Sequence, residues 1–141
     1  MILADVNVLL HALRQAAPEH ARYRTWVDGV VNEGEPFGMS PQALAAVVRI
    51  ATNPRIFAMP DPPEAVIAFA NTLLDHPNCK VVQPGPRHWG IFTDLCRVAN
   101  ARGNLVQDAW FAALAIEADC EWITLDRDYA RFPGLRWRAP F

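Results

Sequence analysis

The chain has 141 residues, of which 52% are hydrophobic and 20% are charged, so it can bury one sizeable core without a metal or disulfide staple. Its three cysteines are widely spaced and form no CxxC pair, which argues against a disulfide framework or a zinc site and favours a cytoplasmic protein. The formal net charge of −2 argues against a globally basic surface for nucleic acid, and no apolar run approaches the about 18 residues of a membrane span.

Short apolar runs alternate with helical patterns along the chain. We expect strands at residues 2–4, 37–39, 79–83, 121–125 and 135–138. We expect helices at residues 6–13, 18–33, 41–52, 63–74, 87–102 and 105–118, with Gly103 ending the fifth and Val98 in the core. Strands that alternate with helices predict a parallel sheet covered on both faces, with its active site beyond the carboxyl ends of the strands.

Acidic residues fall at the edge where such a site lies. Asp5 directly follows the first strand, Asp126 directly follows the strand at 121–125, and Asp128 comes two residues later. Asp108 lies in the first turn or so of a helix beside these strand ends. Each has a local alternative, since Asp5 or Asp108 can stabilise a helix start and the other two can form a turn. Clustered together, the carboxylates would instead favour a hard cation, Mg²⁺ or Mn²⁺, of the kind that supports phosphodiester hydrolysis.

Four stretches carry a resemblance to a known family: ILADVNVLLHA, LAAVVRIATNPRIF, VQDAWFAALAIE and ITLDRDYARFPGL. Their order and spacing resemble the PIN-domain ribonucleases, and more closely the VapC toxins of bacterial toxin–antitoxin pairs. The resemblance implies a single PIN domain over residues 1–141, with three α/β/α layers and a central, mostly parallel sheet of four or five strands. It also implies a Mg²⁺-dependent endoribonuclease that is inhibited by a cognate antitoxin protein and forms a homodimer.

The resemblance also implies roles for individual residues. Three match acidic residues of the family's metal-binding quartet and would be catalytic: Asp5, Asp108 and Asp126. We expect these three to bind the metal, with Asp128 as a further ligand. Asn7 and Thr124 would support them. The candidate RNA contacts are Arg49, Arg127 and Arg131.

One position departs from the family pattern. A glutamate is usual three residues before the arginine of the RxxTNP stretch, and here that position is Ala46. The first hypothesis is an active ribonuclease in which Asp5 and Asp108 hold one metal ion and Asp126 acts through water. The alternative is a catalytically impaired PIN module that binds RNA or a partner. The three retained aspartates favour the enzyme, whereas Ala46 favours the alternative.

Overall fold

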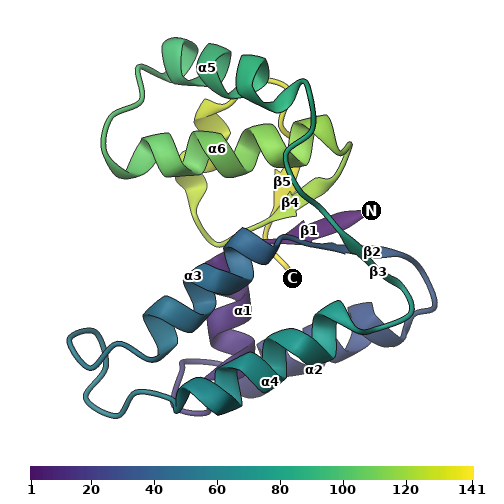
Figure 1. The fold of residues 1–141 in the computed structure, drawn as a ribbon, viewed down its shortest axis with the longest axis vertical. Coiled ribbons are helices and arrows are strands. Elements are labelled where there is room, and N and C mark those ends of the chain that lie inside the picture. Colours follow the sequence, from purple (N-terminus) through teal and green to yellow (C-terminus); the bar gives the residue numbers. More distant parts are fainter.

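A five-stranded parallel sheet forms the centre of the molecule (Figure 1). The computed structural model describes all 141 residues and orders the strands β3-β2-β1-β4-β5. The strands are β1 (Ile2–Ala4), β2 (Phe37–Met39), β3 (Cys79–Val81), β4 (Glu121–Ile123) and β5 (Trp137–Arg138). Every neighbouring pair is parallel, which confirms the predicted α/β fold, although the last three strands are shorter than expected.

Helices cover both faces of the sheet, because parallel strands require crossover connections. The helices are α1 (Val6–Leu13), α2 (His20–Asn32), α3 (Pro41–Ala51), α4 (Pro63–Leu74), α5 (His88–Ala99), α6 (Asn104–Glu117) and the 3₁₀ helix η1 (Arg127–Arg131). In the view of Figure 1, α5 and α6 lie above the strands and α1 to α4 lie below them, which gives the three predicted layers. None of the helices combines the length and apolar character that crossing a membrane requires.

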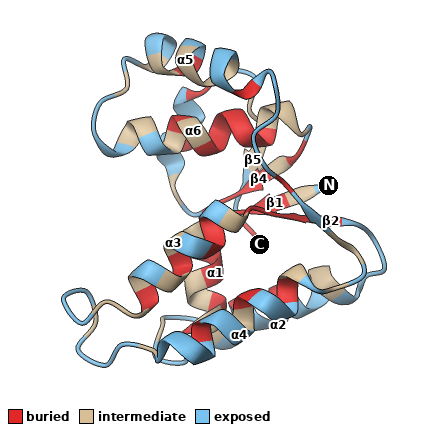
Figure 2. Ribbon diagram, in the orientation of Figure 1, coloured by how far each residue is buried: buried red, intermediate tan, exposed pale blue.

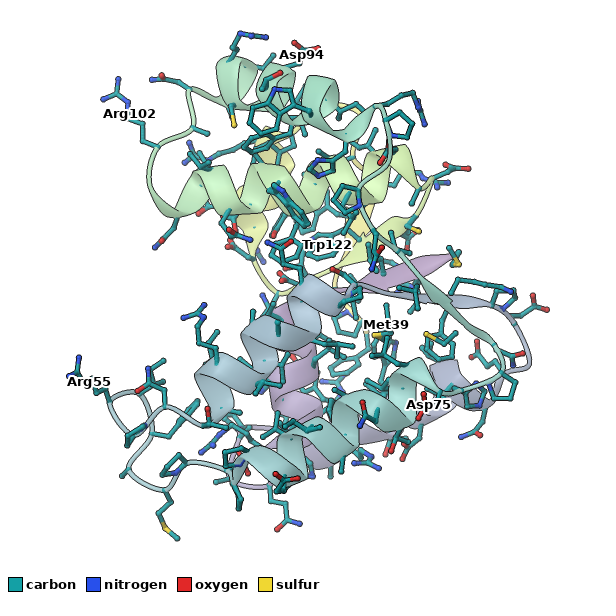
Figure 3. The ribbon with its side chains drawn as sticks, viewed as in Figure 1. Met39, Arg55, Asp75, Asp94, Arg102 and Trp122 are labelled. Carbon is teal, nitrogen blue, oxygen red and sulfur yellow. The ribbon has the colours of Figure 1, made fainter.

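The core has two parts, one on each side of the sheet. Val8 and Leu44 belong to the part under α1 to α4, and Leu114 and Trp122 belong to the part under α5 and α6. Figure 2 shows buried residues on the strands and along the middle of α6, with exposed residues on the outer side of α5. Trp122 lies between the sheet and α6 (Figure 3), where its ring stacks on Phe111 with centroids 5.4 Å apart.

Backbone conformation explains where the helices differ from the prediction. α2 begins at His20 and not at the preceding proline, because Glu19 adopts a left-handed φ of 55°. α5 stops before Asn100, which takes the left-handed conformation (φ 47°) that ends many helices. Gly103 therefore does not end α5 but precedes α6, with φ 56°. The prediction that Val98 lies in the core is wrong, since this side chain is 66% exposed on α5.

The register of the two central strands decides which polar residues meet. Ala4 of β1 pairs with Ile123 of β4, and the backbone N–H of Asp5 donates to the Ile123 carbonyl at 2.8 Å. The residues that follow the two strands, Asp5 and Thr124, are therefore neighbours at the carboxyl edge of the sheet. This edge is where parallel α/β proteins place their ligands.

Candidate active site

A cavity of about 670 Å³ lies at the carboxyl ends of β1 and β4. Its wall is formed by the start of α1, by one face each of α3 and α6, and by residues at η1. Asp5, Asp108 and Asp126 all lie in this wall. The fold thus brings the three carboxylates together from three separate parts of the chain.

Asp5 is the residue whose geometry is most strongly fixed. It is 6% exposed and caps α1, with Oδ1 accepting a hydrogen bond from the Val6 backbone N–H at 2.7 Å. Its Oδ2 accepts from the Thr124 hydroxyl at 2.6 Å and from the Asn7 amide at 3.1 Å. A carboxylate offers about four acceptor positions, so one position on Oδ1 stays free for a ligand. Capping a helix and binding a ligand are therefore compatible for this residue.

Asn7 and Thr124 connect the first strand to the last motif. The Asn7 amide also donates to the Thr124 hydroxyl oxygen at 3.2 Å, and that oxygen accepts from the Asp126 backbone N–H at 3.0 Å. Asp126 in turn caps η1, since its Oδ1 accepts from the Asp128 backbone N–H at 2.8 Å. This network fixes the distance between the carboxylates of Asp5 and Asp126.

Asp108 lies one residue further into its helix than the sequence suggested. α6 begins at Asn104, so Asp108 is past the first turn, and the helix dipole does not account for it. The Tyr129 hydroxyl donates to Asp108 Oδ1 at 3.4 Å, a long hydrogen bond, and no other side chain contacts this carboxylate by hydrogen bonding. Most of its acceptor capacity faces the cavity.

Burial and mutual repulsion raise the proton affinity of the site. Burial raises the pKa of Asp5 to about 6, with further contributions from the charges of Asp108 and Asp126, against the lowering effect of its hydrogen bonds. Burial also raises the pKa of Asp108 to about 6, followed by repulsion from Asp126 and Asp128. The pKa of the buried Tyr129 hydroxyl is raised as well, by burial first and then by the three cavity carboxylates, so it stays a hydrogen-bond donor. A bound cation would relieve this repulsion.

The donor chemistry of the cavity suits a hard cation. Its wall contains carboxylates and amides but no histidine or cysteine, and oxygen ligands select Mg²⁺ or Mn²⁺. As the side chains stand, no three acidic, histidine or cysteine residues are grouped so that they could hold a metal ion together. The arrangement therefore fits an ion held directly by one or two carboxylates that keeps several waters, which is the usual mode for Mg²⁺.

Comparison with known proteins identifies the family. The PIN domain family matches residues 2–135, nearly the whole chain. The chain belongs to the PIN domain family. VapC ribonuclease Mb2897 of Mycobacterium bovis is 40% identical over 140 residues, which cover 99% of this chain and 95% of that protein. Ribonuclease VapC31 of Mycobacterium tuberculosis is 39% identical, covering 99% of both chains. The resemblance to VapC-type PIN domains inferred from the sequence is thereby confirmed.

Solved structures share this PIN fold. VapBC2 from Rickettsia felis, bound to a promoter DNA fragment, has a TM-score of 0.71 at 15% identity, over 99% of this chain and 98% of that one. VapC20 of Mycobacterium tuberculosis, a sarcin–ricin loop cleaving toxin, has a TM-score of 0.63 at 15% identity, over 96% and 99%. At these identities the likeness establishes the fold.

The remaining residues that the sequence singled out in this PIN domain are divided between the cavity and the outer surface. Arg49 and Ala46 lie in the cavity wall, on the face of α3 that borders the same cavity as α6. Arg49 forms no salt bridge. Asp128 is exposed outside the wall and pairs with Arg131 at 3.6 Å. Arg127 is also exposed outside the wall. The structure therefore places Asp128 and these two η1 arginines next to the site, but not in it.

Four further side chains of the wall were missed in the sequence. Gln42, Asn104 and Gln107 lie in the wall with a helical spacing that is present in the sequence, since Gln42 is seven residues before Arg49 and Asn104 is four residues before Asp108. The sequence around Tyr129 does not mark it as a site residue, because an aromatic residue shortly after a strand is usually part of the hydrophobic core.

Proposed function

We propose that this PIN domain is a Mg²⁺-dependent endoribonuclease toxin of the cytoplasm, in which Mn²⁺ can replace Mg²⁺, and that a cognate antitoxin protein restrains it. The observation that carries the proposal is the single cavity that holds three carboxylates and one unpaired arginine. The full-length relatives named as VapC ribonucleases support an RNA substrate.

Different side chains of the cavity have different roles in the proposed phosphodiester hydrolysis. A divalent ion, when bound, polarises the phosphate and activates water. Asp5, through its free Oδ1 position, and Asp108, through its open side, would bind that ion directly. Asp126 lies in the same wall and would orient the attacking water. Arg49 is the only cationic side chain in the wall, and its guanidinium would bind the phosphate of the substrate.

The charge of the cavity also supports control by an antitoxin. A basic side chain placed between Asp5 and Asp108 would satisfy the repelling carboxylates and exclude the metal, so one contact would block the enzyme.

We also propose a homodimer. Trp89 and Val98, which are 69% and 66% exposed on α5, are apolar side chains of the kind that subunits bury.

Expression in bacteria and cleavage in vitro test the enzyme together. Wild-type protein should arrest growth and cut single-stranded RNA with Mg²⁺ but not with EDTA, whereas Asp5→Ala and Asp108→Asn should do neither. Because Asp5 also caps α1, Asp108→Asn serves as the variant that keeps the fold. Asp75→Asn, which removes an exposed carboxylate on the far end of α4, is the matched control and should behave as the wild type. Equal growth arrest by wild type and Asp108→Asn would refute the catalytic proposal.

Ala46 is the one observation that favours a second function. It lies in the cavity wall where the family pattern has a glutamate, so the site has one carboxylate fewer than the resemblance implies. An RNA- or partner-binding module without catalysis would bind labelled RNA in the presence of Mg²⁺ and leave it intact. Metal-dependent products in the same assay would exclude this alternative.

A further inference from the structure

We infer that Gln42, Asn104 and Gln107 form a subsite that reads the edge of an unpaired RNA base beside the bond to be cut. The inference rests on the proposed ribonuclease function and deepens it, because it names the part of the substrate that the protein recognises. None of these three residues belongs to the carboxylate site.

Two helices present the amides to the same cavity. On α3 the wall residues are Gln42, Ala45, Ala46, Arg49 and Ile50, and on α6 they are Asn104, Gln107, Asp108 and Phe111. Both sets follow the three- and four-residue spacing of one helix face, so the amides lie on the same faces as the phosphate-binding and metal-binding side chains. Gln42 is in the first turn of α3, and Asn104 and Gln107 are in the first turn of α6.

The three amides have no partner within the protein. Asn7, in contrast, uses its amide group within the wall to bond Asp5, Thr124 and the Leu125 backbone. No hydrogen bond ties the side chains of Gln42, Asn104 or Gln107, and all three residues are exposed to the cavity and solvent. Their donors and acceptors are therefore available to a ligand.

The chemistry of the wall favours a base over a second phosphate at this position. Phosphates are repelled by the three carboxylates except where Arg49 or a bound cation neutralises them. An uncharged amide carries a donor and an acceptor side by side, which is the arrangement that pairs with the polar edge of a nucleobase. Such edges are open to proteins mainly in single-stranded loops and bulges.

The subsite discriminates by hydrogen bonds and not by stacking. Phe111 and Tyr129 are the aromatic residues of the wall, and they are only 4% and 1% exposed, so neither offers a face on which a base can stack. Stacking accepts every base, whereas amide hydrogen bonds differ between bases. Cleavage should consequently depend on the identity of the base next to the cut.

Sequence position links the subsite to the reacting bond. Gln107 directly precedes Asp108 on α6, and Gln42 lies two turns from Arg49 on α3. At 1.5 Å rise per residue, the amides lie on the order of 10 Å or less along their helices from the groups that bind the phosphate and the metal. This separation is comparable to the reach from a phosphate to the edge of a base on an adjoining nucleotide.

A pool of hairpin RNAs with randomised loops tests the inference. The pool is cut by wild type, Gln42→Met, Gln107→Met and Gln15→Met with Mg²⁺, and the bases on each side of every cut are read by sequencing. Methionine keeps the length of glutamine and removes its hydrogen bonds. Gln15, an exposed residue outside the cavity wall, is the matched control.

We expect the wild type to prefer particular bases next to the cut and Gln15→Met to keep that preference. Gln42→Met and Gln107→Met should each reduce the ratio of cleavage rates at the preferred and disfavoured base by about 5- to 150-fold. Unchanged preference in both variants, or cleavage by the wild type without any base preference, would overturn the subsite and leave the ribonuclease proposal intact. Failure of the wild type to cut any member of the pool would overturn both.

Discussion

Replacing Asp108 by asparagine should stabilise the metal-free protein at neutral pH while it abolishes activity. Asp108 is half-buried and also lies near two other carboxylates, and it has little compensation, since its one hydrogen bond, from Tyr129, is 3.4 Å long. Asparagine has the same shape, keeps an acceptor for the Tyr129 hydroxyl and carries no charge. The variant therefore isolates the electrostatic penalty of the site.

The size of this penalty follows from the pKa of Asp108. The carboxyl titrates near 3.8 in an unfolded chain and at about 6 in the folded one. One pKa unit corresponds to about 1.4 kcal/mol, so the difference of roughly two units would correspond to about 3 kcal/mol. Asp108 is only half-buried, and screening by solvent on its open side reduces the expected gain in the free energy of unfolding to about 1–2 kcal/mol.

The gain should depend on pH in one direction. Below about pH 4 the carboxyl is protonated in both states, so its stabilising contribution to the wild type is fully present. As the pH rises toward 6, the unfolded chain releases its proton first and the folded wild type loses stability. The asparagine variant lacks this loss, so the difference should be small at about pH 4 and constant above about pH 7.

Urea unfolding in EDTA between about pH 4 and 8 measures this difference. In a parallel thermal unfolding experiment at pH 7.5, the melting temperature should rise by about 3–6 °C in Asp108→Asn. Asp75→Asn, with the same change of net charge at an exposed position, should shift it by less than about 1 °C. Saturating Mn²⁺ should stabilise the wild type more than the variant. If Asp108→Asn is no more stable than the wild type at pH 7.5, or if its gain is the same at pH 4, then burial and neighbouring charges do not destabilise the ionised Asp108 as described.

Three further predictions concern the cavity wall. Tyr129→Phe should weaken Mn²⁺ binding in calorimetry by about 3- to 10-fold, because it removes the one hydrogen bond that orients Asp108, and unchanged affinity would contradict this. Arg49→Ala should raise KM for RNA and lower the slope of log affinity against log salt by about one, whereas Arg97→Ala, at an exposed ion pair on α5, should change neither. Ala46→Glu should tighten Mn²⁺ binding and lower the melting temperature in EDTA, because it adds a carboxylate to the wall; a variant with unaltered metal affinity would show that this position does not reach the ion.

Much of the fold followed from local patterns. Ser40 before Pro41 marked the start of α3, and the structure shows the Ser40 hydroxyl accepting from the Ala43 backbone N–H at 3.2 Å. The alternation of short apolar runs and helices predicted the parallel sheet. The helix ends at Glu19 and Asn100 were missed, because either residue adopts a left-handed backbone only when its neighbours impose it.

By itself the sequence determined which residues are chemically able to form the site. Asp5 had to follow a strand and cap a helix, and both features depend only on neighbouring residues. Spacing along each helix likewise settled that Arg49 shares a face with Ala46, since helix geometry is local.

Only the tertiary structure decided which of these residues share one cavity. The pairing of β1 with β4 places Asp5 against Thr124, and the packing of α6 on the sheet brings Asp108 to them. Asp128, on η1, is exposed and lies outside the cavity wall. Side-chain direction and distance between segments about 100 residues apart depend on how helices and strands pack, and no local pattern encodes that.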